Sequence, residues 1–495
     1  MIDVLRLPLI GRILKRRRGR LVLQIPFLLI ALLLIYDGFT GTPLAAQNLA
    51  TIVSWVHFRG FAILALLLAG NLFCMGCPFT LPRTLAKRLS LSGRRFPRFL
   101  RGKWLSIGAL LLLFFLYEWL DLWASPALTA WVIVAYFAAS FVLEALFSES
   151  AFCKYVCPLG AFNFVYSTAA PTRIGVHDAD VCKSCVGKEC LNGSYSPQPV
   201  ILIDRIGVDG APDRTHTHDK TGVPGCGTLL FAPQIQSNLD CTLCLDCARA
   251  CPHDNVGLFT RAPGAELTQP DAWHKRFDLA FLVIGLAFMG LLNAFGMIPP
   301  VYALMSDLID ALGLRELGWS SLALEGVALL TIFGVGGVLL PVLLTVAAAF
   351  AARILTRTAR RDSLRSALSA FAPAFVPIGA GFWLAHYSFH LWIGFFTVVP
   401  AFQAFLLDHR VGILGQPNWM LGGEPNLAII GALQTLALLG GFIGSLSVAS
   451  RIALRLYRRD SFLGLLPWAL LLLALMLVGL WVFGQPMEMR GALFD

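Results

Sequence analysis

Long apolar runs, separated by shorter polar segments, dominate this chain of 495 residues. Nearly all of them reach the length of about 20 residues that an α-helix needs to cross the hydrocarbon core of a bilayer. They predict an α-helical polytopic membrane protein with about nine transmembrane helices, at residues 21–37, 51–73, 104–124, 127–148, 275–298, 320–352, 368–404, 427–450 and 461–484. The run 368–404 is too long for one straight span and contains three prolines, so we expect it to be kinked or broken.

The charge pattern orients these spans. Residues 1–20 carry seven Lys or Arg, and the segment 78–103 carries eight with no acidic residue. The intervening loops carry only two arginines in all; these loops are residues 38–50, 125–126, 300–319 and 405–426. By the positive-inside rule, the N-terminus is cytoplasmic and the C-terminus, after nine crossings, lies outside. The net charge of +10 therefore follows the membrane topology, and membrane lipid rather than nucleic acid is the expected partner.

Twelve cysteines give the first indication of chemistry, and by this topology none of them lies outside the membrane. A cytoplasmic location keeps thiols reduced, which favours metal binding over a disulfide framework. Four of them form the sequence CTLCLDCARACP, which has the C-x2-C-x2-C-x3-C-P spacing of bacterial ferredoxins; they are Cys241, Cys244, Cys247 and Cys251. A zinc ribbon would need two separate pairs of cysteines, so the crowded run favours an iron–sulfur site.

A second cysteine run, CKSCVGKEC, precedes the first and contributes Cys182, Cys185 and Cys190. In two-cluster ferredoxins the last cysteine of such a run ligates the other cluster. We therefore expect an inserted cytoplasmic α+β domain of the bacterial two-cluster ferredoxin type, at residues 171–270, with two [4Fe–4S] clusters. One ligand set would be Cys182, Cys185, Cys190 and Cys251, and the other Cys241, Cys244, Cys247 and Cys226.

Two features of the insertion between these runs keep alternatives open. Cys226, in PGCG, is the nearest candidate for the fourth ligand of its set, but it could also be an unligated loop thiol. His216 and His218 belong to a segment rich in Pro, Gly and Asp, which indicates a solvated loop. A metal-binding role for these two histidines is the alternative.

The four remaining cysteines lie in two pairs where apolar runs meet the cytoplasm. Cys74 and Cys77 lie in FCMGCPFTLPR, and Cys153 and Cys157 in FCKYVCPLG. Four thiolates at one membrane depth can complete one metal site, and the proline after each pair ends the helix so that the thiols can turn toward it. We expect a third iron-containing centre there: a [2Fe–2S] cluster, a [4Fe–4S] cluster or a single iron. Zinc, or unligated buried thiols, are the alternatives.

With these motifs the chain resembles the membrane polyferredoxins of the NosR/NapH/CcoG type. The resemblance covers about residues 50–265 and is most specific in FCKYVCPLGAF. It implies electron transfer across or along the bacterial cytoplasmic (inner) membrane. The first pair reads C-x2-C-P where that family usually has C-x3-C-P, and the family's [ST]-G-A-T flavinylation signal is missing, so no covalent FMN is expected. The last five spans have no counterpart that the resemblance assigns.

Ionisable residues inside the predicted spans are costly to bury and are candidates for function. His57, His386 and His390 all map to the outer half of the membrane, and the last two lie one helical turn apart. A pair with this spacing cannot supply both axial ligands of one haem. These histidines could contact neighbouring helices, bind a quinone, ligate haem b or hold a small metal ion. Arg59 is expected to pair with Glu118 or Asp121.

Together these patterns divide the chain into four parts. We expect a four-helix membrane region at 1–150 with the first cysteine pair, a membrane-edge segment at 151–170, the ferredoxin-like domain at 171–270, and a five-helix membrane module at 275–495. The predicted protein is an electron-transfer subunit of an oxidoreductase. It would pass electrons between a cytoplasmic donor (a ferredoxin, a flavodoxin or a dehydrogenase subunit) and a quinone, a haem or an acceptor outside, in either direction.

Two other classes of function remain in competition at this stage. The first is a redox regulator or a metallocentre-assembly factor that reduces a metal for a respiratory enzyme. The second is a transporter whose clusters are regulatory. Paired charges are scarce in the last five spans, which argues against transport.

Overall fold

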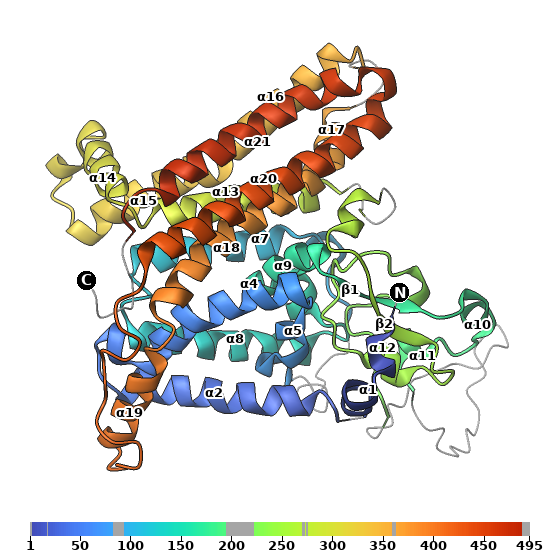
Figure 1. Ribbon diagram of the computed structural model, residues 1–495, viewed down its shortest axis with the longest axis horizontal. Coiled ribbons are helices and arrows are strands. Elements are labelled where there is room, and N and C mark those ends of the chain that lie inside the picture. Colours follow the sequence, from blue (N-terminus) through green and yellow to red (C-terminus); the bar gives the residue numbers. More distant parts are fainter. Residues whose placement is uncertain are drawn as a thin grey trace.

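Apolar helices form most of the molecule, and a small two-stranded sheet lies at one end (Figure 1). The computed structural model describes residues 2–16, 18–82, 94–194, 222–269, 273, 276–358 and 363–487. His216 and His218 lie outside the described residues. The prediction of a polytopic helical membrane protein is confirmed, because seven segments of the described chain are long and apolar enough to cross a membrane.

Each predicted apolar run contains helix. The long helices are α2 (Leu21–Thr40), α3 (Leu49–Thr51) continued by the π-helix Ile52–Phe58 and α4 (Arg59–Leu68), α7 (Trp104–Trp119), α8 (Pro126–Leu146), α13 (Phe277–Phe295), α15 (Ser321–Gly334) and α16 (Leu340–Leu355), α17 (Leu364–Phe371) and α18 (Phe375–Ile393), α20 (Leu427–Tyr457) and α21 (Ser461–Phe483). The last of the seven segments, Leu427–Phe483, contains both α20 and α21, joined by a turn at Arg458–Asp460. The apolar helix α7 is shorter, with 16 residues.

The expected break in the run 368–404 is confirmed. A 3-10 turn at Ala372–Ala374 separates α17 from α18, and α18 ends at Ile393 before α19 (Val398–Asp408) begins. The three prolines of this run lie within the 3-10 turn or in the first turn of a helix, where a missing backbone N–H leaves no hydrogen bond unmade; they are Pro373, Pro377 and Pro400.

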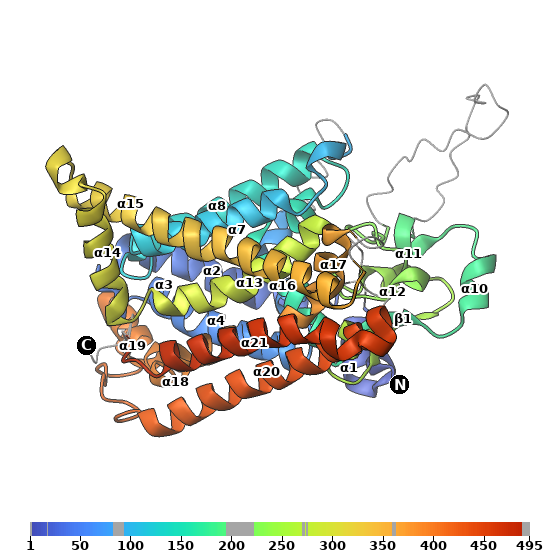
Figure 2. The same cartoon turned by 90° about the horizontal axis from the view of Figure 1, so that it is seen from above.

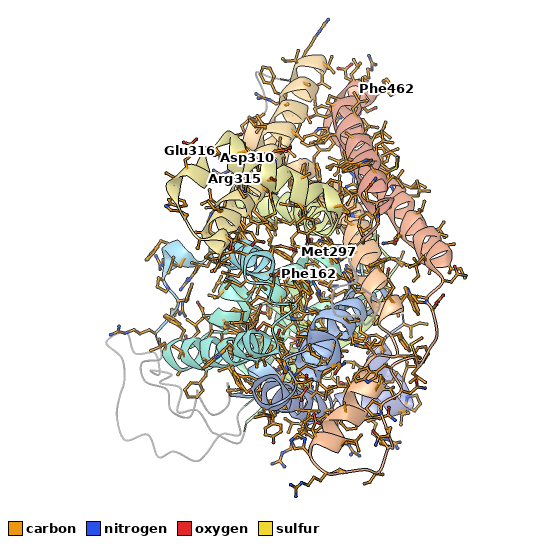
Figure 3. All side chains as sticks on the ribbon, turned by 90° about the vertical axis from the view of Figure 1, so that its left-hand side faces the viewer. Phe162, Met297, Asp310, Arg315, Glu316 and Phe462 are labelled. Atoms are coloured by element: carbon orange, nitrogen blue, oxygen red, sulfur yellow. The ribbon has the colours of Figure 1, made fainter. Side chains whose placement is uncertain are left out.

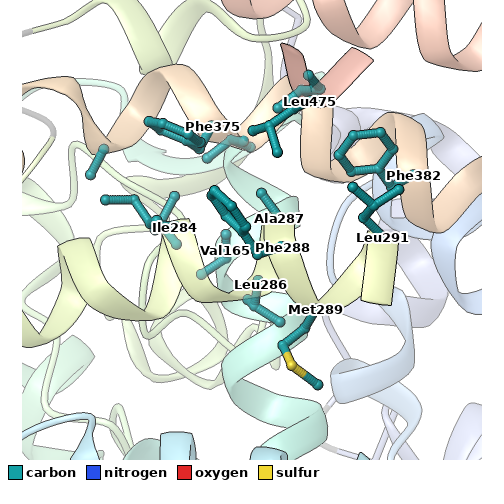
Figure 4. Packing of buried hydrophobic residues seen from close by; sticks show 14 of the residues in the cluster. Val165, Ile284, Leu286, Ala287, Phe288, Met289, Leu291, Phe375, Phe382 and Leu475 are labelled. Carbon is teal, nitrogen blue, oxygen red and sulfur yellow. The ribbon is translucent and has the colours of Figure 1, made fainter. Parts of the chain in front are cut away.

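Helix α13 lies at the centre of the membrane bundle. In its most apolar stretch of 18 residues 83% are buried, whereas in the corresponding stretch of α8 only 22% are buried. Apolar side chains of α13 pack against α18, α21 and the short helix α9 (Pro158–Tyr166), as Figure 4 shows for Phe288, Phe375, Leu475 and Val165. Helices α18 and α20 approach closely at glycines: a Cβ added at Gly441 would lie 2.8 Å from the carbonyl oxygen of Pro377. Small residues at such contacts are typical of membrane helices.

The part of the chain outside the bundle carries the cysteine runs. Strands β1 (Thr172–Val176) and β2 (Val256–Thr260) pair antiparallel, with Thr172 opposite Thr260 and Val176 opposite Val256. Short helices α10 (Ala179–Ser184), α11 (Glu189–Asn192) and α12 (Asp246–Ala250) lie between them in the chain. The first cysteine run follows β1 and the second precedes β2. Since the two strands are neighbours, the first run begins close to where the second run ends. These elements agree with an α+β domain, and the ferredoxin fold itself stays a prediction.

The N-terminal residues pack against this sheet. The carboxylate of Asp3 accepts hydrogen bonds from the backbone N–H of Leu258 and Leu5, and it lies 3.0 Å from the ring of His177. Helix α1 (Pro8–Leu14) follows close by. In Figures 1 and 2 the N-terminus, α10, α11 and α12 lie at one end of the molecule, and α14 (Pro299–Ala311) and α19 lie at the other.

The basic connections lie on the side of the cysteine runs. Helix α17 and the turn from α20 to α21 are found at the same end as β1 and α12 (Figure 2). Arg353, Arg365, Arg455 and Arg458 come from these connections or the helix ends beside them. The chain thus gathers its positive loops at one end of the bundle, as the alternating charge pattern requires.

Candidate functional site

Four cysteines line a pocket among α10, α11 and the residues after α12. They are Cys182, Cys185, Cys190 and Cys251, and we call them the distal set. Asn255 joins two of them, because its backbone N–H donates to the Cys251 sulfur at 3.4 Å and its side-chain amide donates to the Cys182 sulfur at 3.2 Å. The structure therefore brings together one whole ligand set that the spacing rule predicts, including the cysteine from the far run.

A second group, the proximal set, lies next to the first; its members are Cys241 and Cys247, which are buried, and Cys226 and Cys244, which are half-buried. Burial raises the pKa of the Cys247 thiol well above its usual range, and the charges of the other three raise it further. The backbone N–H of Cys226 donates to the carbonyl oxygen of Cys190 at 3.0 Å, which ties this set to the distal one. Cys226 thus lies close enough to Cys241, Cys244 and Cys247 for its charge to affect their pKa values, and its role as the fourth ligand stays a prediction.

The backbone around the proximal set has an unusual conformation. Asp240, Leu243 and Leu245 all have positive φ angles, of 63°, 52° and 63°. Left-handed residues other than glycine cost roughly 1–2 kcal/mol each, so other interactions of the folded protein must offset the strain in this loop. Alternating left-handed and right-handed residues turn backbone N–H groups toward one point, and such nests bind anions and iron–sulfur centres. Three cysteines of the proximal set lie in or directly after this loop: Cys241, Cys244 and Cys247.

The third group, the membrane-edge set, joins the two CP-ended pairs; it contains Cys74, Cys77, Cys153 and Cys157. Burial raises the pKa of Cys157 well above its usual range, and the charges of Cys74 and Cys77 add to that rise. The backbone leaves the helix at Cys77 and Cys157, with ψ of 119° and 115°, directly before each proline. The expected turn after each pair is therefore present.

Two hydrogen-bond donors serve the sulfurs of this set. The Gly160 N–H donates to Cys157 at 3.1 Å, and the Asn163 amide donates to Cys74 at 3.3 Å. Both donors belong to α9, which follows the second cysteine pair. Hydrogen bonds to thiolates stabilise their charge, so α9 prepares these sulfurs to act as ligands.

Asn71 connects the membrane-edge and proximal sets. Its side-chain oxygen accepts from the backbone N–H of Cys74 at 3.4 Å, and its amide nitrogen donates to the carbonyl oxygen of Cys241 at 3.1 Å. One buried side chain therefore spans the gap between a cysteine of each set.

Arg20 is a second connection. Its guanidinium donates to the carbonyl oxygens of Met75 and Cys74, at 2.7 and 3.1 Å. Burial and the charge of Asp246 raise the pKa of Cys244 to about 11, and the charge of Arg20 opposes this rise. Arg20 thus places a positive charge beside cysteines of both sets, where it compensates negative charge on their sulfurs.

Within the described residues, no group of three or more His, Cys, Asp or Glu side chains is placed to hold a metal ion. A cubane cluster separates its four thiolates around a core of iron and sulfide, so the ligands of a cluster do not converge on one ion. The donor chemistry of the three sets, four cysteines in each, fits iron–sulfur binding.

Comparisons with protein-family models, characterised proteins and solved structures give no match. The resemblance to the polyferredoxins therefore rests on the motifs alone, and the functional argument rests on the geometry of the three cysteine sets.

The histidines inside the bundle fall into two places. His57, in the π-helix, has its ring nitrogens 3.2 Å from the carbonyl oxygen of Ile52 and 3.0 Å from that of Phe395. These contacts favour its interpretation as a link between helices. His386 and His390 form a separate pair on the buried face of α18, with ring centroids 5.2 Å apart.

The predicted ion pair of Arg59 with Glu118 or Asp121 is wrong. The Arg59 guanidinium donates to the hydroxyl of Tyr117 and lies 4.8–5.1 Å from the ring centres of Trp55, Tyr117 and Tyr387. Glu118 instead faces α13 and accepts from the amide of Asn293 at 3.2 Å. Aromatic faces attract a desolvated guanidinium, which offers a buried arginine an alternative to a carboxylate.

Sequence reasoning missed Asn71, Arg20, Asn255 and Met297. Asn71 lies three residues before Cys74, and Asn255 lies four after Cys251, so polar residues flanking the cysteines were the available signal. Arg20 looks like one more residue of the basic N-terminal segment. Nothing in the sequence around Met297 indicates that its sulfur contacts the ring of His390.

Proposed function

We propose that this protein is an iron–sulfur electron-transfer protein of the bacterial cytoplasmic membrane. The observation that carries the proposal is the order of the cysteine sets: distal, proximal and membrane-edge sets adjoin one another from the exposed end of the molecule to the start of the bundle. When bound, two [4Fe–4S] clusters and a third iron-containing centre would take up and release single electrons.

The two ends of this series of cysteine sets differ in their exposure to solvent. The distal set lies at the surface, where Val186 beside it is 84% exposed, so a soluble partner can approach it. The membrane-edge set, of which Cys74 and Cys77 are buried and Cys153 and Cys157 half-buried, lies beside the spans and receives hydrogen bonds from α9. We infer a cytoplasmic donor, such as a ferredoxin, a flavodoxin or a dehydrogenase subunit, at the distal end. A quinone or haem in the membrane, or a partner oxidoreductase, would exchange electrons at the other.

The basic connections at the end of the cysteine sets support a cytoplasmic location for that end. The reducing cytoplasm would also keep all twelve thiols available as ligands, since disulfides persist mainly in oxidising compartments. In this orientation the N-terminus and the cysteine-rich part face the cytoplasm and the opposite end, with α14 and α19, faces outside.

Purification of the full-length protein under anaerobic conditions tests the proposal. We expect about eight irons from the distal and proximal sets, further iron from the membrane-edge set, and acid-labile sulfide in matching amount. Reduction with dithionite should give iron–sulfur EPR signals, and an added quinone analogue should discharge them. Zinc in place of iron, or fewer than about four irons per chain, would contradict the proposal.

Asn71 gives a finer test of the route between the proximal and membrane-edge sets. Replacing Asn71 by Leu removes both of its hydrogen bonds and should slow the reoxidation of the reduced clusters severalfold, with iron content unchanged. The matched control is Asn192→Leu, at an asparagine whose amide donates to the Gly187 carbonyl in an exposed position. If both variants are reoxidised at the wild-type rate, Asn71 has no part in the route.

A further inference from the structure

One contact inside the bundle is not explained by the cysteine sets. The Nε2 atom of His390, on α18, lies 3.4 Å from the sulfur of Met297, in the turn that follows α13. Met297 is 0% exposed and His390 4% exposed, and Figure 3 shows Met297 inside the helical bundle. A thioether and an imidazole nitrogen, both buried, thus meet in the interior of a membrane protein.

A second imidazole adjoins this contact. His386 lies one turn before His390 on the same helix face and is 0% exposed; its ring is tilted by 41° to that of His390, with the ring centroids 5.2 Å apart. Two imidazoles from α18 and one thioether from the segment after α13 therefore adjoin one another, with His390 between His386 and Met297.

The distance between the two contacting atoms fits one small metal ion. An ion about 2.0 Å from an imidazole nitrogen and about 2.3 Å from a sulfur holds these atoms about 3.5 Å apart when the coordination is tetrahedral. The observed separation is 3.4 Å. As axial ligands on opposite sides of a haem iron, the same atoms would lie about 4.3 Å apart with a macrocycle between them, so this contact favours an ion over haem.

The ligand types and the nearby charges select among ions. Thioether sulfur is a soft ligand that favours Cu(I), while calcium and magnesium take oxygen. Arg59 lies over the ring of Tyr387, the residue after His386, so a bound cation must tolerate a positive charge nearby. A monovalent ion does this at lower cost than a divalent one, because burial penalises charge steeply. Glu118 offers partial compensation, since a Cβ added at Gly296, next to Met297, would lie 3.2 Å from its carboxyl carbon.

We propose that His386, His390 and Met297 form a Cu(I)-binding site buried among the membrane helices. The site goes beyond electron transfer through the cysteine sets and does not depend on it. It lies on helices of the five-helix module, for which the motifs suggest no role.

The test uses the full-length protein, purified anaerobically with its iron in place so that the cysteines are occupied. Cu(I) is added, excess is removed with the competing chelator bicinchoninate, and copper and iron are measured per chain. We expect wild-type protein to retain about one copper more than His390→Asn or Met297→Leu. X-ray absorption at the copper edge should show nitrogen ligands together with a single sulfur near 2.3 Å.

Met289→Leu is the matched control, because Met289 is buried like Met297 but lies within α13, eight residues before Met297. Methionine to leucine conserves volume and is tolerated in cores. Loss of copper from Met297→Leu but not from Met289→Leu is therefore explained by the missing sulfur ligand and not by misfolding. Equal copper in the wild type and both site variants, or a copper environment of sulfur alone, would overturn the proposal. Iron content serves as the separate measure of the cysteine sets, so copper and iron results fail independently.

Discussion

Full-length protein with Cys77→Ser and Cys153→Ser together is expected to lose the iron of the membrane-edge set and to stop passing electrons to a membrane acceptor. These residues come from different CP-ended segments, so the double change removes two of four thiolates from a site that needs all of them. Hydroxyls ligate iron far less well than thiolates do. The distal and proximal sets keep every cysteine, and their iron and EPR signals should persist.

The control for this result is Cys182→Ser, which removes one thiolate from the distal set and leaves the membrane edge intact. It should lower iron content as well, but through a different centre, so the two variants must differ in their EPR spectra. Should the double variant keep both its iron and its electron flow, Cys74, Cys77, Cys153 and Cys157 would be packing residues, and the route into the membrane would have to start elsewhere.

The second large effect concerns two single substitutions at cysteines that are predicted to join a set away from their neighbours in the sequence. Cys251→Ser is expected to cost about four irons from the distal set, and Cys226→Ser about four from the proximal set. Cys251 follows Cys247 in the chain, yet Asn255 holds its sulfur beside Cys182. Cys226 lies outside both runs, yet its charge contributes to the raised pKa of Cys241, Cys244 and Cys247.

Iron analysis and EPR of the reduced single variants distinguish the two sets. Each variant should retain the signal of the set that the other one loses. If Cys226→Ser keeps its full iron content, Cys226 is an unligated loop thiol. If Cys251→Ser loses the proximal signal instead, the cysteines follow sequence order and the crossed assignment is wrong.

The helical architecture was predictable because each span is defined by its own residues. Twenty apolar residues need no partner in the sequence to be recognised, and the break between α18 and α19 followed from the length of one run and its prolines. The cysteine groups were nearly as accessible, since C-x2-C spacings put ligands within reach of one another. Their ligation by iron stays a prediction.

Contacts between distant segments were not predictable in the same way. Met297 meets His390 across 93 residues, and Asn71 meets the Cys241 carbonyl across 170, and neither local sequence contains a sign of the other. The error at Arg59 has a different cause. A buried cation was assumed to need a carboxylate, while the fold surrounds it with the faces of Trp55, Tyr117 and Tyr387.

The contact between Asp3 and Leu258 also has a consequence for the order of events during synthesis. The residue that receives the Leu258 N–H is made 255 positions earlier. At 5–20 residues per second a ribosome needs about 13–50 s to cover that distance, and the first four spans leave it in the meantime. The N-terminal segment must therefore wait beside the membrane until β2 emerges. The pocket of the distal set, which Asn255 and Val256 help to line, is completed only afterwards, when the first half of the bundle has already been made.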